Sequence, residues 1–398
     1  MKIRIFQLFS IGIFFTFWIS GCQNSPSPSI GPCITPLSNL LFPVHKIFPP
    51  RTESTNEVFP SGNWQIEATL PGTIPDHIDS LLSRKNNEIW MIVELSVEKK
   101  SLVYRYRTDT HHWTSYASIE GVPIIPETLV VTPDGNLWGI GRINNSQEIV
   151  SSTWPLISRF DEATDQFRFV YDEGKSLQTF YAHRSPPMVQ SDNSGNLWLI
   201  INQGFTKPSS LYSFNPKTAE LTQHLPEIKL SGYGSLAISA NNDIWIFDPN
   251  LETKIIQFHP STGAYRDNFL SHSDWHIENW NGDLYYDNSG KLWSGIDGWL
   301  DFTNPVVPVW HRIIPSAILI SPDYYDVEDQ SIWTHPSYIY QSSNGWYWFS
   351  FPNNGIMRLD TQTGSWCKFT TQYSPVVEDS QKNIRIVMEG KIYLLSLN

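Results

Sequence analysis

A short phrase built around tryptophan recurs along the chain and constrains its fold more than any other feature. In each copy a turn segment of Asn, Asp, Ser or Gly is followed by an apolar residue and then by Trp. Six copies end at Trp90, Trp138, Trp198, Trp245, Trp293 and Trp348, and a degenerate seventh copy reads Gln381-Lys382-Asn383-Ile384-Arg385. Repeats of one structural unit are therefore expected, and the length of 398 residues does not imply two or three unrelated domains.

The spacing of the copies predicts the architecture. Successive tryptophans are 48, 60, 47, 48 and 55 residues apart, and Arg385 follows 37 residues after the last of them. A period of about 40–50 residues with four short strands in each repeat is typical of a β-propeller blade. We therefore predict an all-β fold, a seven-bladed β-propeller of four-stranded antiparallel blades over residues 63–398.

The two ends of the repeat region predict how the ring closes. The last repeat supplies three candidate strands, near 376–377, 384–387 and 392–397, and no fourth strand. Residues 63–70 (NWQIEATL) resemble the outer strands of the other repeats and belong to no repeat of their own. We expect 63–70 to complete the seventh blade, because a sheet that joins both ends of the repeat region hides its edges.

The recurrent Trp is expected to pack between neighbouring blades, where its large ring fills the space between two sheets. The alternative is a row of tryptophans that stack on a sugar. Recurrence in every blade favours the packing role, since packing is needed at every junction and one ligand is not.

The first 21 residues have the pattern of an export signal. Lys2 and Arg4 precede an apolar run over residues 5–19, which is shorter than the roughly 20 residues that span a membrane as a helix. The alternative is an N-terminal membrane anchor that is not cleaved.

Ile19-Ser20-Gly21-Cys22 resembles a bacterial lipobox, which implies a lipoprotein whose lipid is carried by Cys22. We therefore predict a lipoprotein signal peptide over 1–21 and a Pro/Ser-rich tether over 22–62. The expected location is the cell envelope, where a lipid anchor would hold the chain at a membrane, facing away from the cytoplasm.

The remaining two cysteines are Cys33 in the tether and Cys367 in the sixth repeat. An exported compartment permits disulfides. A Cys33–Cys367 bridge would attach the tether to the propeller, and two independent thiols are the alternative.

Composition excludes one class of partner. Asp and Glu number 39 and Lys and Arg number 27, so the formal net charge is −12. Binding to nucleic acid needs clustered cations for the phosphates, so nucleic acid is not an expected partner. We expect a monomer.

The connections between the predicted strands are unequal in length. Long connections are predicted at 142–155, 171–186, 271–282 and 314–336, all on the face opposite to the short turns. Extended loops on one side of a rigid scaffold are the usual place for binding. The ligand class stays open between a protein, a glycan and a small molecule.

Two of these loops carry candidate ligand-binding residues. Trp275 and Trp280 flank His276 and Glu278, and indole rings beside a carboxylate can stack on a sugar or an aromatic ligand. His183 and Arg184 in the second loop could meet an anionic group.

The same loops carry weak candidates for a metal site, although no cofactor is required by any motif. His272, His276 and Glu278 could bind zinc or another divalent ion. Asp323, Asp326 and Glu328 could bind Ca²⁺, but their spacing is not that of an EF-hand loop. Surface histidines with ordinary hydrogen bonds and a solvated acidic loop are the alternatives.

The Gly-Asn-Leu-Trp units at 135–138 and 195–198 resemble two-component-regulator propeller repeats of bacterial sensor proteins. They also resemble the repeats of streptogramin B lyase, where the resemblance implies chemistry by His and Glu with a magnesium ion. Repeats of that family typically continue Leu-Trp-Phe-Thr-Glu. Here Trp is followed by Gly139, Leu199, Ile246 or Ser294, so the activity is not carried over.

These observations favour a membrane-anchored binding module, either a sensor or a scaffold, over an enzyme. The alternative is a metal-assisted lyase or hydrolase of the streptogramin-lyase type. No Gly-x-Ser-x-Gly, His-Glu-x-x-His or phosphate-loop motif occurs in the sequence.

Overall fold

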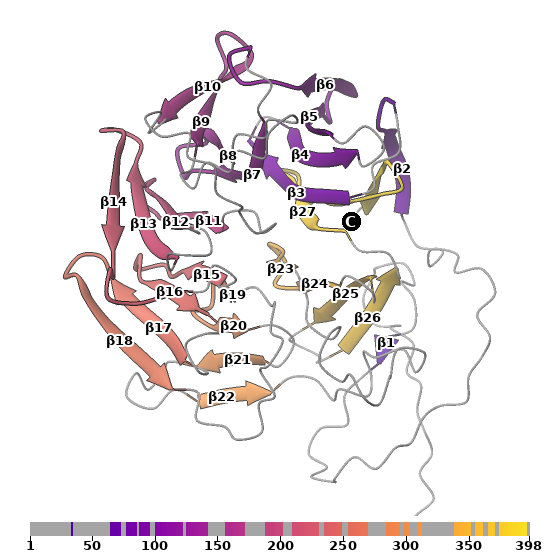
Figure 1. The fold of residues 1–398 in the computed structure, drawn as a ribbon. Coiled ribbons are helices and arrows are strands. Elements are labelled where there is room, and N and C mark those ends of the chain that lie inside the picture. Colours follow the sequence, from indigo (N-terminus) through magenta and orange to yellow (C-terminus); the bar gives the residue numbers. More distant parts are fainter. Residues whose placement is uncertain are drawn as a thin grey trace, which may run out of the picture.

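The computed structural model describes 33–34 and most of 64–395. Gaps in the description lie at 73–76, 86, 96–99, 122–124, 142–155, 172–187, 202–208, 231–234, 249–253, 270–283, 295–297, 302–308, 313–337, 352–354, 361–364 and 371–373. The described residues form seven antiparallel sheets that stand side by side around a common axis (Figure 1). None of the described residues forms a helix of the length and apolarity needed to cross a membrane.

The first three blades follow one another along the chain, each with its strands in sequence order from the axis outward. Blade 1 consists of β3 (His77–Arg84), β4 (Glu88–Leu95), β5 (Lys100–Arg107) and β6 (His112–Tyr116). Blade 2 consists of β7 (Pro126–Val131), β8 (Leu137–Gly141), β9 (Leu156–Asp161) and β10 (Gln166–Tyr171). Blade 3 consists of β11 (Met188–Ser191), β12 (Leu197–Ile201), β13 (Ser210–Asn215) and β14 (Glu220–His224).

The next three blades repeat this order. Blade 4 consists of β15 (Ser235–Ile238), β16 (Ile244–Phe247), β17 (Lys254–His259) and β18 (Ala264–Phe269). Blade 5 consists of β19 (Leu284–Tyr286), β20 (Leu292–Ser294), β21 (Gly298–Asp301) and β22 (Val309–Arg312). Blade 6 consists of β23 (Tyr338–Gln341), β24 (Tyr347–Phe351), β25 (Gly355–Asp360) and β26 (Ser365–Thr370), with β1 (Cys33–Ile34) as a fifth strand at its outer edge.

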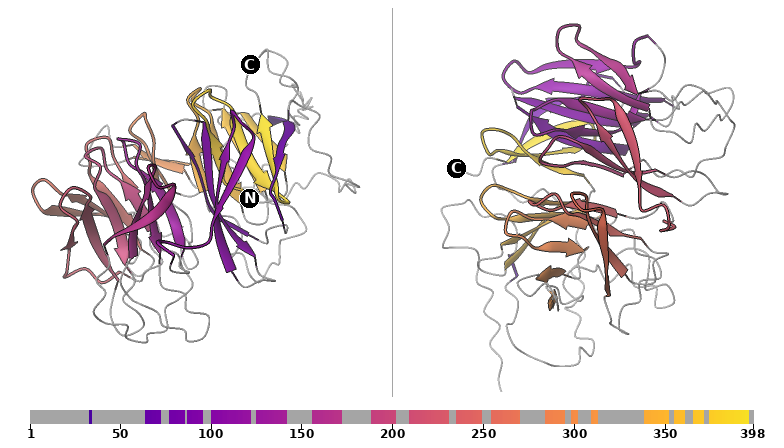
Figure 2. Two further views of the ribbon diagram at one scale, coloured as in Figure 1. Left: turned by 90° about the horizontal axis from the view of Figure 1, so that it is seen from above. Right: turned by 90° about the vertical axis from the view of Figure 1, so that its left-hand side faces the viewer.

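Blade 7 joins both ends of the repeat region. It consists of β27 (Val376–Glu378), β28 (Ile384–Met388), β29 (Lys391–Leu395) and β2 (Trp64–Thr69), and β2 pairs antiparallel with β29. In the left view of Figure 2 the indigo strand β2 stands beside the yellow strands of this blade. The innermost strands also contact one another around the whole axis, with β27 against β3, so the predicted seven-bladed, four-stranded propeller and its closure by residues 63–70 are confirmed.

Apolar packing between blades forms the core. The second strand of a blade is buried on both of its faces, as in β12, whose residues Leu197–Ile201 are all buried. Trp90 packs with Leu129 and Phe160 of the next blade, and Trp198 packs in the same way with Leu236 of blade 4. The predicted place of the tryptophans between blades is therefore confirmed.

Burial of an indole also buries its N–H group, which needs an acceptor. Asp192 supplies one in blade 3: its Oδ2 accepts from Trp198 Nε1 at 3.0 Å, while its Oδ1 accepts from the backbone N–H groups of Ser194 and Asn196. Asp287 does the same for Trp293 at 2.8 Å. In blades 3 and 5 a single carboxylate therefore accepts hydrogen bonds both from the backbone of the turn and from the indole that packs between the blades.

Blade 7 has an arginine at the position where the other blades have the buried Trp. Arg385 stands at the Trp position and is 4% exposed, Asp379 on its own blade is 1% exposed, and Glu67 on β2 is 8% exposed. Arg385 donates from Nε to Glu67 Oε2 at 2.7 Å and from Nη1 to Asp379 Oδ2. Burial alone would raise the pKa of Asp379, but hydrogen bonds from Arg385 and from the Asn383 backbone hold that pKa below its usual value.

Replacement of Arg385 by Met is expected to destabilise the ring at its closure, because it leaves two buried carboxylates without their cation. The free energy of unfolding should fall by about 3–5 kcal/mol, the usual cost of removing one partner of a buried ion pair. Denaturant titration followed by tryptophan fluorescence measures this. Lys382→Met, on the exposed turn of the same blade, is the control and should change stability by less than about 0.5 kcal/mol.

The same pair of chains should differ in pH dependence. The pKa of Asp379 is lowered by folding, so its stabilising effect is present above the unfolded value of about 3.9 and is lost as the pH falls through the folded pKa. The wild-type chain should therefore lose stability below about pH 4 more steeply than Arg385→Met. An equal slope in both chains would contradict the role given to this ion pair.

Candidate functional site

The two faces of the ring differ in the length of their connections. Turns between the first and second strands are short, with three residues in blade 1 and five in the other blades, as in 192–196 and 287–291, and we call this side the short-turn face. Connections between the second and third strands, and between successive blades, leave from the opposite side, which we call the long-connection face. The long segments 142–155, 172–187, 270–283 and 313–337 all begin and end there.

The candidate ligand residues Trp275, His276, Glu278, Trp280, His183 and Arg184 lie outside the described residues, and so do the metal candidates His272, Asp323, Asp326 and Glu328 and the lipidation candidate Cys22. What the structure does place is the pair of strands from which each segment departs. Residues 270–283 connect β18 of blade 4 to β19 of blade 5, and residues 172–187 connect β10 of blade 2 to β11 of blade 3.

Tyrosines gather on the innermost strands of blades 5 and 6, and we call Tyr285, Tyr286, Tyr338 and Tyr340 the tyrosine cluster. All four are partly buried. Tyr340 donates its hydroxyl hydrogen to Glu378 Oε2 of blade 7 at 3.1 Å, and Tyr285 accepts from the backbone N–H of Gln341 at 3.3 Å. These bonds link three neighbouring blades close to the axis.

The phenols of Tyr285 and Tyr340 are held in their neutral form. Burial raises the pKa of Tyr285 to about 12, and burial together with the charge of Glu378 raises the pKa of Tyr340 further. A phenol with so high a pKa donates hydrogen bonds at neutral pH but does not act as a base. Tyr285 and Tyr340 therefore offer hydroxyl groups for hydrogen bonding, but neither acts as a base at neutral pH.

A carboxylate and an imidazole meet on the short-turn face of blade 4. His259 Nδ1 lies 2.6 Å from Asp243 Oδ1, and Gln257 donates to the other oxygen of the same carboxylate at 3.0 Å. A catalytic use would require a nucleophile beside the imidazole. Within the described part of the chain the imidazole contacts Asp243, and the hydroxyl of Thr262 donates to the backbone oxygen of His259 at 3.4 Å and not to its ring, so the pair joins a turn to the third strand of its own blade.

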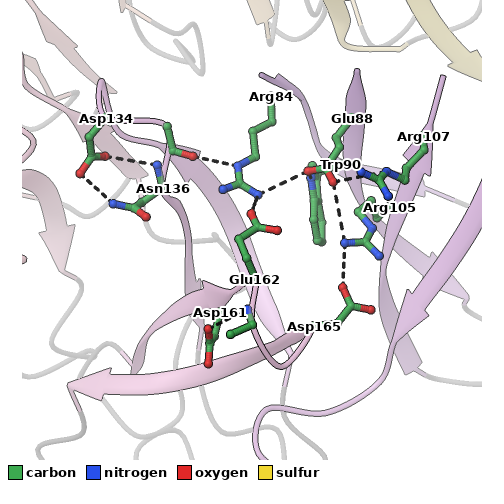
Figure 3. Close-up of polar contacts among 12 residues, drawn as sticks. Arg84, Glu88, Trp90, Arg105, Arg107, Asp134, Asn136, Asp161, Glu162 and Asp165 are labelled. Carbon is green, nitrogen blue, oxygen red and sulfur yellow. Dashed lines mark hydrogen bonds and ion pairs between the residues drawn. The ribbon is translucent and has the colours of Figure 1, made fainter. Parts of the chain in front are cut away.

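Among the described residues, a dense group of charges lies between blades 1 and 2, also on the short-turn face, and is drawn in Figure 3. Glu88 is only 3% exposed and is surrounded by three arginines. Its carboxylate lies 3.4 Å from Arg84 Nη1, 3.8 Å from Arg105 Nη1 and 3.9 Å from Arg107 Nε. Trp90 Nε1 also donates to Glu88 Oε2 at 3.0 Å, so Glu88 is the acceptor for the indole of blade 1.

Two exposed acids from the turn 162–165 of blade 2 complete this charge cluster. Glu162 pairs with Arg84, and Asp165 lies 2.8 Å from Arg105 Nη1. The guanidinium of Arg105 also lies 5.4 Å from the centre of the Trp90 ring, a distance typical of a cation–π contact. Arg84 Nε donates to the backbone oxygen of Gly135 at 2.8 Å, so this arginine holds both turns of blade 2.

The charge cluster of blades 1 and 2 is balanced, with three cations facing three anions. Each arginine already has a carboxylate partner, so the cluster fits the role of a clamp between blades better than that of an anion site. Among the described residues, no group of three His, Cys, Asp or Glu side chains could hold a metal ion.

One position in each repeat could have predicted these ionic groups, but the search for the Trp repeat did not consider it. The position six residues before the Trp is usually a hydrogen-bond acceptor, such as Asp192 or Asp287, but is Arg84 in blade 1. A cation at this position leaves the indole of Trp90 without its usual acceptor, and Glu88 replaces it. In the same way Arg385 in place of Trp indicates a need for acids nearby.

No protein-family model matches the chain, and no curated protein matches it in sequence. Many solved structures share its fold. Streptogramin B lyase aligns with a TM-score of 0.57 and 13% identity, over 84% of this chain and 98% of the other. YCF48 bound to a D1 peptide aligns with a TM-score of 0.52 and 11% identity, over 84% and 97% of the two chains.

PorZ, a bacterial surface component of the type-IX secretion system of Porphyromonas gingivalis, aligns with a TM-score of 0.56 and 13% identity. The alignment covers 82% of this chain and 48% of PorZ, so the chain spans about half the length of that protein. At such low identity these alignments show a shared seven-bladed architecture and leave activity, ligand and partner to be argued from the residues themselves.

Replacement of Glu88 by Gln is expected to destabilise the junction of blades 1 and 2. Glutamine keeps an oxygen acceptor for Trp90 but removes the only buried anion among three arginines. The free energy of unfolding should fall by about 3 kcal/mol. Glu162→Gln removes an exposed anion of the same cluster and should cost at most about 1 kcal/mol. Denaturant titration of both variants checks the comparison, and equal losses would contradict the structural role of Glu88.

Proposed function

We propose that this chain is a lipid-anchored protein of the cell envelope whose propeller binds a ligand or a partner protein through its long-connection face. The single observation that carries the proposal is the placement of the long segments. All four leave from one side of a closed ring, while the connections on the opposite side have only three to seven residues.

A physical argument connects this asymmetry with binding. Short turns are what the repeat needs to connect its strands, and added chain length costs conformational entropy when it is ordered. Length that is confined to one face of a rigid scaffold therefore serves something other than folding, and binding is the usual purpose. Streptogramin B lyase and YCF48 bound to a D1 peptide show that the same fold occurs both in a lyase and in a protein that binds a peptide.

The segment 270–283 supplies the chemistry that supports a ligand site best. Within it Trp275 and Trp280 bracket His276 and Glu278. Two indole rings offer flat apolar surfaces, and the neighbouring polar groups can bind hydroxyls, a combination suited to a glycan or to an aromatic group of a peptide. His183 and Arg184 in the segment 172–187 add a cation for an anionic substituent.

The anchor is proposed from the first 22 residues. Lys2 and Arg4, the apolar run and Cys22 follow the order of a lipoprotein signal. Acyl chains on Cys22 would keep the propeller at a membrane surface.

Replacement of both Trp275 and Trp280 by Ala should weaken ligand binding at least about tenfold, since each buried indole contact contributes on the order of 1 kcal/mol or more. Binding to a panel of immobilised oligosaccharides and peptides, measured by surface plasmon resonance, is the test. Tyr265→Ala removes an exposed aromatic residue from the outer strand of blade 4 and is the matched control. Unchanged binding by the double variant would contradict the proposed site.

A second candidate function rests on the same segment. His272, His276 and Glu278 lie within seven residues of one another and include the residue types that bind a catalytic divalent ion. This arrangement favours a metal-assisted lyase or hydrolase as the alternative to a pure binding module.

Metal analysis separates the two functions. If the chain is a binding module, the purified protein should contain less than about one tenth of an equivalent of Mg²⁺, Mn²⁺ or Zn²⁺, and His276→Ala should not alter that content. Inductively coupled plasma mass spectrometry measures the content after dialysis. One equivalent of metal that is lost in His276→Ala but kept in His112→Ala, an exposed histidine of β6, would favour the enzyme.

A further inference from the structure

We propose that Cys33 and Cys367 form a disulfide that fixes the N-terminal segment to the outer edge of blade 6. Strand β1 lies against β26 as the fifth strand of that sheet (Figure 1). The two strands are antiparallel, and the register places Cys33 opposite Cys367 and Ile34 opposite Trp366. The pairing brings together two cysteines that are separated by more than 300 residues of chain.

The backbone geometry of this pair suits a disulfide. Directly opposed residues of antiparallel strands have their Cα atoms about 4.5 or 5.5 Å apart, depending on whether the pair is hydrogen-bonded. Disulfides join Cα atoms that are about 4.4–6.8 Å apart, so either kind of pair lies within range. Opposed residues also share one face of the sheet, so the bond would form without a shift of the register.

The register also tells which face of blade 6 would carry the bond. Cys367 is opposite Arg358 of β25, and Arg358 is opposite Trp348 of β24. Trp348 packs with Val376 of blade 7, so this row of residues lies on the face of blade 6 that is turned toward blade 7. The bond would therefore lie on the side of the sheet next to the blade that β2 completes.

A covalent bond explains why so short a strand is held at this edge. Strand β1 has only two residues, and the backbone bonds of two residues offset little of the entropy lost when the chain is ordered. With the disulfide, the N-terminal segment is attached twice, to blade 6 at β1 and to blade 7 at β2. Blades 6 and 7 are built from the last two repeats of the sequence.

The reaction is an ordinary two-electron oxidation. Both S–H bonds break, one S–S bond forms, and two protons and two electrons leave. A disulfide-bearing thiol oxidase, or oxidised glutathione, accepts the electrons and is itself reduced to thiols. The exported compartment of the proposed function supplies such an oxidant, and the structural inference does not depend on which one acts.

The bond has a consequence that rests on the proposed lipid anchor. Cys33 follows Cys22 by 11 residues, so a chain of at most about 3.6 Å per residue reaches about 40 Å. Strand β2 begins at Trp64, which follows Cys22 by 42 residues, and an attachment at that strand alone allows a reach of about 150 Å. The disulfide would thus keep the outer edge of blade 6 near the membrane.

The test uses the purified full chain with Cys22→Ser, which removes the third thiol and the lipid together. The chain is equilibrated in a glutathione redox buffer, alkylated, and digested without reductant for mass spectrometry. We expect a linked pair of peptides that contain Cys33 and Cys367. Alkylation of both thiols in the folded chain would overturn the proposal. Neither result depends on export or on ligand binding, so the proposed function is tested separately.

A register control and a stability measurement complete the experiment. In Cys33→Ser/Ile34→Cys the thiol moves by one residue to the other face of the strand, and no link to Cys367 should form. Reductant should lower the unfolding temperature of the Cys22→Ser chain by about 3–6 °C and should leave that of Cys22→Ser/Cys367→Ser unchanged. A link in the register variant, or the same response in both chains, would contradict the pairing.

Discussion

The structure depends on filling the space between blades that diverge from a common axis. Sheets that radiate from a centre leave wedge-shaped gaps, and large buried side chains must occupy them at native packing density. Trp90, Trp138, Trp293 and Trp348 are among the largest fully buried side chains of the described residues. Trp90, Trp198, Trp293 and Trp348 donate from Nε1 to acceptors inside the wedge, so the packing of these four rings is linked to polar groups in or next to the turn before the second strand, whereas Trp138 Nε1 has no such acceptor among the described residues.

The acceptors show how the same requirement is met in different ways. Asp192 and Asp287 use one carboxylate to close the turn and to accept from the indole. Ser342 accepts from Trp348 Nε1 at 3.2 Å with a neutral hydroxyl. Blade 1 uses Glu88 from the start of its second strand, and this buried anion in turn requires the arginines around it. Arg84, at the position where other blades have an acceptor, thus belongs to a cluster of ion pairs between two blades.

The seventh junction follows the same logic at the point where the ring closes. Arg385 joins Asp379, the usual acceptor of the turn, to Glu67 on the strand that comes from the other end of the repeat region. A buried ion pair contributes little net stability compared with apolar packing. A buried charge that lacks its partner, however, strongly lowers the free energy of unfolding. An apolar closing strand could slip in register, whereas Glu67 satisfies Arg385 in one alignment only, so the ion pair would set the register of β2 against β29.

The amino-acid sequence by itself determined the repeat, the number of blades and the closing strand, because a turn followed by a buried Trp leaves a local and periodic trace. It also marked Arg84 and Arg385 as departures from that pattern. Only the tertiary structure decided which acids neutralise them, since Glu162 and Glu67 lie 78 and 318 residues away and their spacing carries no signal. The pairing of β1 with β26 likewise joins residues that are far apart in the sequence. The sequence left a Cys33–Cys367 bridge and two independent thiols as alternatives, and only the folded register, which places Cys33 opposite Cys367, favours the first.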